Sequence, residues 1–82
     1  MIHKVKLSHE FWSDVVNGRK TFELRKNDRN YQVGDYLLLK EVKNSSPTTR
    51  ECLVEVTYKL ENYIGLQDGY CILGIRLKRG KI

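Results

Sequence analysis

Residues 51–60 read ECLVEVTYKL, which is the clearest strand pattern in the chain. Apolar and polar side chains alternate, and such a period of two is typical of a β-strand with one buried face. We therefore expect a mainly β domain. The apolar positions that share one face of this stretch are Cys52, Val54, Val56, Tyr58 and Leu60.

The flanking sequence repeats this pattern in shorter runs that are separated by turn residues. Before the second run, residues 8–17 carry apolar side chains at helical spacing, and Asn17-Gly18 is a natural helix end. The predicted order is β-α-β-β-β-β, a mainly β (α+β) domain with one or two short helices. We expect the other strands at residues 2–7, 21–25, 36–42 and 70–77, with a polar loop over 43–49.

The chain has 82 residues, so we expect one domain over residues 1–82. Five strands and one helix are too few for two packed sheets. A small, partly closed barrel with the helix plugging or flanking it is the simplest arrangement, because closure removes exposed strand edges. An open α+β sheet is the alternative.

No run approaches the ~20 apolar residues of a membrane span, and we expect a cytoplasmic protein without a membrane partner. Cys52 and Cys71 are expected to be reduced and buried. The two histidines stand apart from any cysteine or carboxylate cluster, so no metal site is expected, and no cofactor motif is present.

The charge balance favours a polyanionic partner. Fifteen Lys and Arg against ten Asp and Glu give a net charge of +5. Basic residues gain affinity for nucleic acids by releasing counterions from phosphates. The alternative is that this charge serves solubility alone.

The richest segment is residues 18–29, which holds five cations and two anions. We expect Phe22 and Leu24 to anchor its strand in the core and Thr21, Glu23 and Arg25 to share the opposite, polar face. The alternative is a solvated face of weak ion pairs. The predicted ligand-binding residues are Lys20, Thr21, Glu23 and Arg25, and those that would steer phosphates are Arg19, Lys26 and Arg29.

Four tyrosines lie in or beside predicted loops, among basic residues. Their rings can stack on bases, or they can pack at the rim of a barrel. The four are Tyr31, Tyr36, Tyr63 and Tyr70.

The stretch GRKTFELR at residues 18–25 resembles the G-x-K-x-x-E-x-R signature of the ASCH domain family. The turn Val33-Gly34-Asp35 and the strand around Glu55-Val56-Thr57 also fit, and the chain is most similar to a short bacterial and phage branch of that family. The resemblance implies a PUA-like β-barrel with a cleft between barrel and helix. It also implies that the Lys20–Arg25 strand forms the floor of this cleft, and that the role is related to RNA or to transcriptional coactivation.

One bacterial branch of the family is an amidohydrolase that acts on N4-acetylcytidine. Lys20 matches its proposed catalytic lysine, but Glu23 stands where that branch has a threonine. Its distant catalytic glutamate has no counterpart in this chain.

Three functions therefore stay open. The first, which we favour, is an RNA- or nucleotide-binding module. The second is a small amidohydrolase acting on a modified nucleoside, with Lys20 as nucleophile or base and Glu23 as general acid/base. The third is a protein-interaction adaptor, and the oligomeric state is open.

Overall fold

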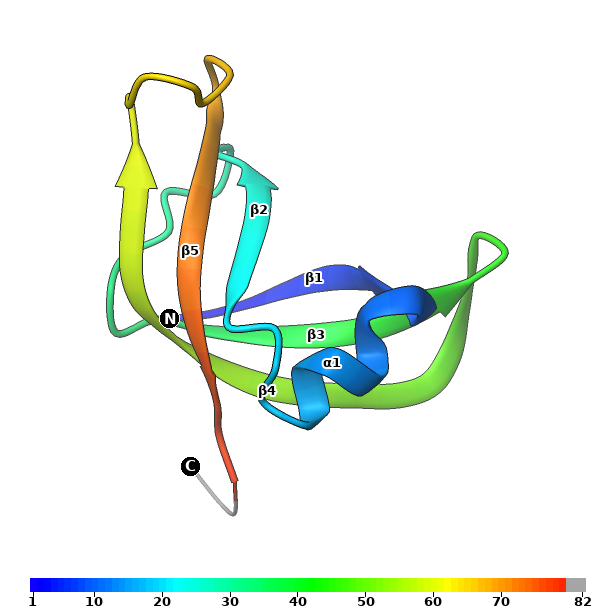
Figure 1. Cartoon of the computed structure of the whole chain (residues 1–82). Helices are drawn as coiled ribbons and strands as arrows, with labels where there is room; N and C mark the ends of the chain where they lie inside the picture. The colour runs from blue at the N-terminus through cyan, green and yellow to red at the C-terminus, as the bar shows by residue number, and fades with distance from the viewer. Residues whose placement is uncertain (80–82) are drawn as a thin grey trace.

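The computed structural model describes residues 1–79, which form a single curled sheet and one short helical segment (Figure 1). The strands are β1 (Ile2–Ser8), β2 (Phe22–Lys26), β3 (Tyr36–Lys43), β4 (Ser46–Glu61) and β5 (Tyr70–Leu77). A 3-10 turn, η1 (His9–Phe11), leads directly into the α-helix α1 (Trp12–Val16). The predicted order β-α-β-β-β-β is therefore confirmed, and residues 80–82 of the predicted domain lie outside the described residues.

The sheet is a half-barrel with the strand order β1-β3-β4-β5-β2. β1 and β3 are parallel, and the other neighbours are antiparallel. The 16-residue strand β4 curves through the whole molecule: its first part pairs with β3 and its second part with β5 (Figure 1). The prediction of a partly closed barrel flanked by a helix is confirmed in this half-barrel form, and its PUA-like classification stays a prediction.

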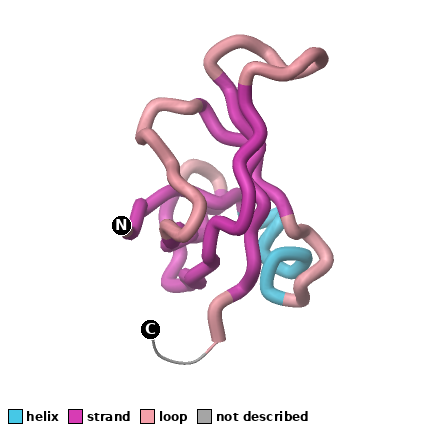
Figure 2. Tube along the Cα trace, turned by 90° about the vertical axis from the view of Figure 1, so that its left-hand side faces the viewer, coloured by secondary structure: helices cyan, strands magenta, loops and turns pink. Residues whose placement is uncertain are grey.

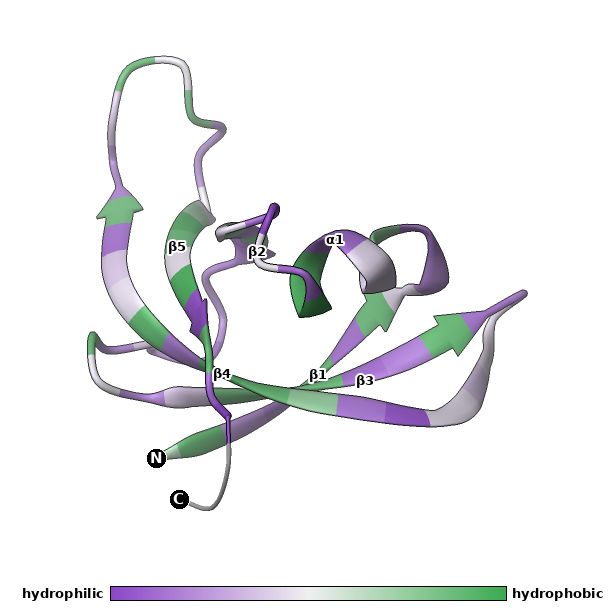
Figure 3. Cartoon of the chain, turned by 60° about the horizontal axis from the view of Figure 1, so that its bottom comes forward, coloured by the Kyte–Doolittle hydropathy of each residue, from purple (hydrophilic) through white to green (hydrophobic). Residues whose placement is uncertain are grey.

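The hydrophobic core lies on the concave side of the sheet, beneath the helix. Every second residue along β1, β3 and the middle of β4 is buried, and both hydrophobic and hydrophilic residues lie along these strands (Figure 3). The helix packs on one side of the sheet and contributes Val15, with Trp12 packed against the same cluster (Figure 2). The core consists of Val5, Leu7, Val15, Tyr31, Leu37, Leu39, Val54, Val56, Cys71, Leu73 and Ile75.

The predicted polar loop at 43–49 is wrong, because β3 and β4 form a tight hairpin there. Only Asn44 and Ser45 connect the strands, and both have positive φ angles of 51° and 64°. Two such residues match a type I′ turn, whose twist suits an antiparallel hairpin. Pro47 fits within β4 because β5 pairs with β4 only from Val54 onward, which leaves the proline on an unpaired edge.

The predicted alternation of residues 51–60 ends at a β-bulge. The pairing of β4 with β5 shifts between Val56 and Tyr58. As a result, Tyr58 leaves the inner face that it was predicted to share with Val56, and its side chain is exposed. Gly74 lies opposite: a Cβ there would stand 2.8 Å from Thr57 Oγ1, so a larger residue would force the Thr57 side chain or the strand to shift.

None of the helices within residues 1–79 is long and apolar enough to cross a membrane.

Candidate functional site

The loop between α1 and β2 places Lys20 at the junction of helix and sheet. Gly18 follows the helix with a φ of 77°, a conformation that glycine adopts at helix ends without strain. The amides of Arg19 and Lys20 both donate to the carbonyl oxygen of Asp14 at 2.9 Å, and Arg19 Nε donates to the Asp14 carboxylate at 3.0 Å. Asp14 therefore fixes the conformation of the loop and the position of the Lys20 backbone.

Lys20, Glu23 and Arg25 form a connected ionic trio. Glu23 Oε1 accepts from Lys20 Nζ at 2.9 Å, and Glu23 Oε2 accepts from Arg25 Nη1 at 3.1 Å. Glu23 is only 5 % exposed, so its charge is compensated by two cations at the edge of the core. The structure thus brings together three of the four predicted ligand-binding residues.

The facing of β2 was predicted the wrong way round. Phe22 and Leu24 are 51 % and 57 % exposed, whereas Glu23 is buried and Arg25 is partly buried. Glu23 and Arg25 pair with Leu73 and Cys71 of β5, both of which are in the core. Lys20 and Arg25 compensate the charge of the buried Glu23 carboxylate. The polar face of this edge strand can therefore turn inward, while its apolar face turns to the solvent.

Two exposed rings flank the ammonium of Lys20. Nζ lies 5.1 Å from the centroid of the Phe11 ring and 4.8 Å from that of Phe22, and it also donates to the Phe22 carbonyl oxygen at 2.9 Å. Ring faces attract a cation, so these contacts hold the Lys20 side chain in this position. Lys20 is therefore arranged to donate hydrogen bonds and to present positive charge.

These groups line a cleft of about 410 Å³ between the end of β1, the helix and β2, which we call the seam cleft. It is lined by Lys6, Leu7, Ser8, Phe11, Lys20, Phe22, Glu23, Leu24 and Arg25. Only one Arg25 nitrogen, Nη1, is paired within the described residues, which leaves the remaining N–H donors of its guanidinium for a ligand.

The other predicted site residues lie outside the trio. Thr21 is exposed and lines a neighbouring cleft of about 480 Å³ together with Lys20 and Arg76. Arg19 lies beside Phe11 and Phe22 while paired with Asp14. Lys26 is exposed on the outer face of β2, and Arg29 donates to the carbonyl oxygen of Lys4 at 3.0 Å.

The four tyrosines do not form one stacking surface. Tyr31 is 1 % exposed and belongs to the core, so it is not free to stack on a base. Tyr36 and Tyr70 are partly buried, and Tyr63 is exposed in the loop between β4 and β5. The exposed rings at the seam cleft are instead those of Phe11 and Phe22, and Phe22 was predicted to lie in the core.

Sequence reasoning also missed a buried carboxylate beside the helix. Glu41 is 2 % exposed, and Arg50 binds it at both oxygens, with Nε–Oε1 at 2.9 Å and Nη2–Oε2 at 2.6 Å. Hydrogen bonds from Arg50 and Thr48 lower the pKa of Glu41 from 4.5 to about 2. The Arg50 guanidinium lies 4.8 Å from the Trp12 ring, so this pair ties the β3–β4 hairpin to the helix.

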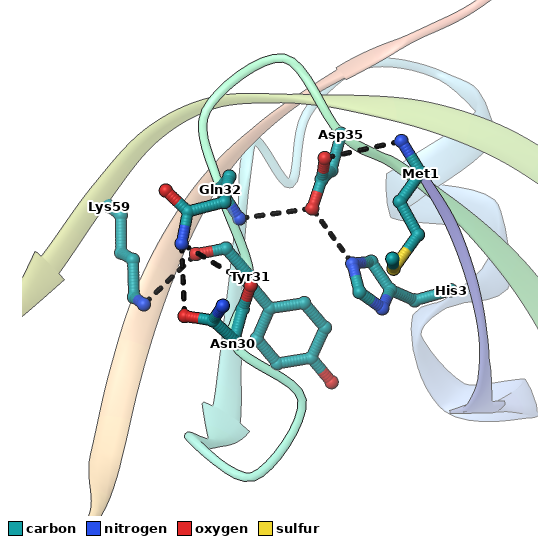
Figure 4. A network of polar contacts seen from close by, with 7 residues as sticks. All are labelled: Met1, His3, Asn30, Tyr31, Gln32, Asp35 and Lys59. Atoms are coloured by element: carbon teal, nitrogen blue, oxygen red, sulfur yellow. Dashed lines mark hydrogen bonds and ion pairs between the residues drawn. The ribbon is translucent and has the colours of Figure 1, made fainter.

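A second polar network closes the turn that precedes β3 (Figure 4). Asp35 Oδ2 lies 2.8 Å from His3 Nε2 and accepts from the Gln32 amide at 3.0 Å. The hydrogen bond with His3 is the largest cause that lowers the pKa of Asp35. Lys59 Nζ donates to the Tyr31 carbonyl oxygen at 2.9 Å, which ties the backbone of this buried tyrosine to β4.

The described residues contain no group of three or more His, Cys, Asp or Glu side chains arranged to hold a metal ion. Cys52 and Cys71 are free thiols, one partly buried and one buried. Burial, followed by the charge of Glu23, raises the pKa of Cys52 to about 11, and burial raises that of Cys71.

Comparison with known proteins places the chain in a family. A model for a domain of unknown function, DUF3850, matches residues 2–75. The chain belongs to the DUF3850 family. The match covers the whole half-barrel up to Ile75 in β5, including the seam cleft.

A protein of Escherichia phage P2 is similar to the chain. It is described as an uncharacterized 12.9 kDa protein in the GpA 3′ region, and it is 41% identical over 56 residues. These residues make up 68% of this chain and 51% of the phage protein, so the chain spans about half the length of that relative.

Proposed function

We propose that this domain binds RNA or a nucleotide in the seam cleft. The observation that carries the proposal is the buried carboxylate of Glu23, clamped between Lys20 and Arg25 at the mouth of a cleft that two exposed rings flank. A polar trio on an edge strand, close to exposed aromatic faces, suits a planar, polar and anionic ligand.

Each group has a chemical role in this proposal. The free N–H donors of Arg25 suit a phosphate, which guanidinium groups bind in a bidentate manner. The rings of Phe11 and Phe22 offer stacking surfaces to a base, a contact that contributes roughly 1–3 kcal/mol per base. The net charge of +5 favours association with any phosphate ligand. The resemblance of residues 18–25 to the ASCH signature supports the same proposal.

An amidohydrolase acting on a modified nucleoside is the second candidate. The specific observation in its favour is the 2.9 Å contact between Lys20 Nζ and Glu23 Oε1, because proton exchange needs such a distance. Lys20 Nζ is also engaged by the Phe22 carbonyl oxygen and two ring faces, so it is not free to attack a substrate. Binding without turnover is therefore the stronger proposal.

The experiment is a titration of the protein with nucleosides, nucleotides and short RNAs by calorimetry. Glu23→Gln keeps the side-chain volume nearly constant but removes the negative charge that binds Lys20 and Arg25. We expect at least a tenfold loss of affinity for the best ligand. Glu51→Gln is the matched control, because Glu51 is an exposed carboxylate on β4. Circular dichroism verifies that both variants are folded.

Two results would decide between the candidates. Absence of binding by every member of the panel would overturn the proposal. Release of acetate from N4-acetylcytidine that is lost in both Lys20→Gln and Glu23→Gln, but kept in Glu51→Gln, would establish the hydrolase instead.

A further inference from the structure

The two edge strands of the half-barrel, β1 and β2, meet at a seam that is bridged by Arg25 of β2 and by Arg29 of the segment that follows it. Arg25 Nη1 donates to the carbonyl oxygen of Lys6, and Arg29 Nη1 donates to that of Lys4, both at 3.0 Å. Lys4 and Lys6 are two residues apart on β1, which corresponds to roughly 6.6 Å along a strand. The guanidinium groups are therefore held one after the other along the seam.

Two further cations lie on the outer side of the same seam. The side chains of Lys4 and Lys6 alternate outward from β1 and are exposed. Within residues 1–79, neither lysine nor Arg29 forms an ion pair. The carboxylate within the trio, Glu23, is already bound by Lys20 and Arg25. Three of the positive charges along the seam, those of Lys4, Lys6 and Arg29, are thus without a paired carboxylate in the described part of the chain.

A row of positive charges suits a ligand whose negative charges also recur. A free nucleotide carries its phosphates at one end and engages one point of such a row. A polynucleotide carries one phosphate per residue and engages several points at once, with release of counterions at each.

The rings at the end of the seam select single strands over duplexes. Phe22 and Phe11 are 51 % and 42 % exposed, and both line the seam cleft. A base stacks on an aromatic ring only when it has left its own helical stack, as in single-stranded RNA. In a duplex the base faces are covered, and only the phosphates would contact the protein.

We propose that the ligand is single-stranded RNA lying along the β1–β2 seam, with phosphates on Lys4, Lys6 and Arg29 and a base against Phe22. This inference rests on the proposed function, because the RNA enters the same cleft. It adds the class of ligand, its path along the seam and the residues of β1 that hold it.

Fluorescence anisotropy with labelled oligoribonucleotides of increasing length, at several salt concentrations, tests the proposal. We expect affinity to rise from the mononucleotide to an oligomer of about six nucleotides. For three to four phosphate contacts, the slope of log K against log salt concentration is about −2 to −3. Lys4→Gln and Lys6→Gln should each reduce the steepness by about 0.7. Lys43→Gln changes an exposed lysine at the β3–β4 hairpin that does not line the seam cleft, and it should leave the slope unchanged.

Phe22→Ala tests the stacking contact separately. Phe22 is half exposed, so the variant should keep the wild-type circular dichroism spectrum while binding the single strand about tenfold more weakly. A duplex of the same sequence should bind more weakly than the single strand.

Three results separate this inference from the proposed function. A mononucleotide that binds as tightly as the oligomer, and that Glu23→Gln weakens, would overturn the inference and leave the proposed function standing. Equal affinity for duplex and single strand, unchanged by Phe22→Ala, would also overturn it. Failure of every mononucleotide and oligomer to bind would overturn both.

Discussion

Two carboxylates with lowered pKa values, those of Glu41 and Asp35, make the stability of the folded domain depend on pH in the acid range. Glu41 has its pKa lowered from 4.5 to about 2 by Arg50 and Thr48, so the folded state holds its proton less strongly than the unfolded chain does. The stability that this pair contributes is therefore complete above about pH 5 and is lost as the pH falls towards 2. Asp35, whose pKa is also lowered, acts in the same direction.

We accordingly predict that the melting temperature falls between pH 5 and pH 2, and that Glu41→Gln flattens this part of the curve. The glutamine cannot ionise, so its contribution to folding does not change with pH. Differential scanning calorimetry over this range measures both curves. Glu51→Gln, which alters an exposed carboxylate, should follow the wild type. A Glu41→Gln profile as steep as that of the wild type would contradict the assignment.

The cysteines give a second prediction at the same scale. Burial and the charge of Glu23 raise the pKa of the Cys52 thiol from 9.0 to about 11, and only the thiolate reacts with alkylating agents. At pH 8 we expect Cys52 in the folded protein to react on the order of 100-fold more slowly than in the urea-unfolded chain. Mass spectrometry after timed iodoacetamide pulses measures this ratio, and equal rates in the two states would show that the thiol is not shielded.

At the scale of elements, the period of the sequence predicted which segments are strands but not always which face is buried. For β5, the predicted bounds, residues 70–77, are those of the structure. For β2, hydrophobicity placed Phe22 and Leu24 inside, whereas the strand turns Glu23 inward to meet Lys20 and Arg25. The reversal depends on an ion pair with a loop residue and on packing against β5, neither of which an isolated strand pattern contains.

The charged residues of the candidate site could be predicted from the sequence, but its aromatic residues and ion pairs could not. The charged residues of 18–25 were singled out because of their density, and the trio formed from them. Phe11 and Phe22 were missed, since an aromatic residue in a helix or strand is more often core than surface. The pair Glu41–Arg50 was missed because its partners lie nine residues apart on two strands joined by a turn that was predicted as a loop.

The β3–β4 hairpin offers a prediction on an element. Ser45 has a φ of 64°, which glycine adopts without strain, and Asn-Gly is the preferred pair for a type I′ turn. Ser45→Gly should therefore stabilise the domain by about 0.5–1 kcal/mol, measured by urea denaturation. Ser45→Val should destabilise it, because a β-branched residue is strained in the left-handed region. Loss of stability in Ser45→Gly would show that the turn has a different conformation.

At the scale of the whole molecule, the half-barrel is one unit, because its two parts share a strand and a core and are not independent halves. β4 belongs to both parts of the sheet, and the core draws side chains from β1, β3, β4 and β5 together with the helix and Tyr31 (Figure 1). Neither part can bury its inner face without the other. At this size a domain has little core to spare, so partial unfolding leaves no stable remainder.

We therefore predict a single cooperative unfolding transition. Trp12 reports on the helix and its contact with Arg50, whereas far-ultraviolet circular dichroism reports on the sheet as a whole. Both signals should give the same midpoint in urea, with a slope of about 1 kcal/mol/M, as expected for a small domain. Arg50→Gln should shift both midpoints together, because the loss of a partner for buried Glu41 destabilises the entire fold. If the Trp12 signal changed at lower urea concentration than the circular dichroism, the helix would be a separate unit docked on a sheet that is stable by itself. The ring of Phe11, in the 3-10 turn before the helix, would then line the seam cleft only while the helix is docked.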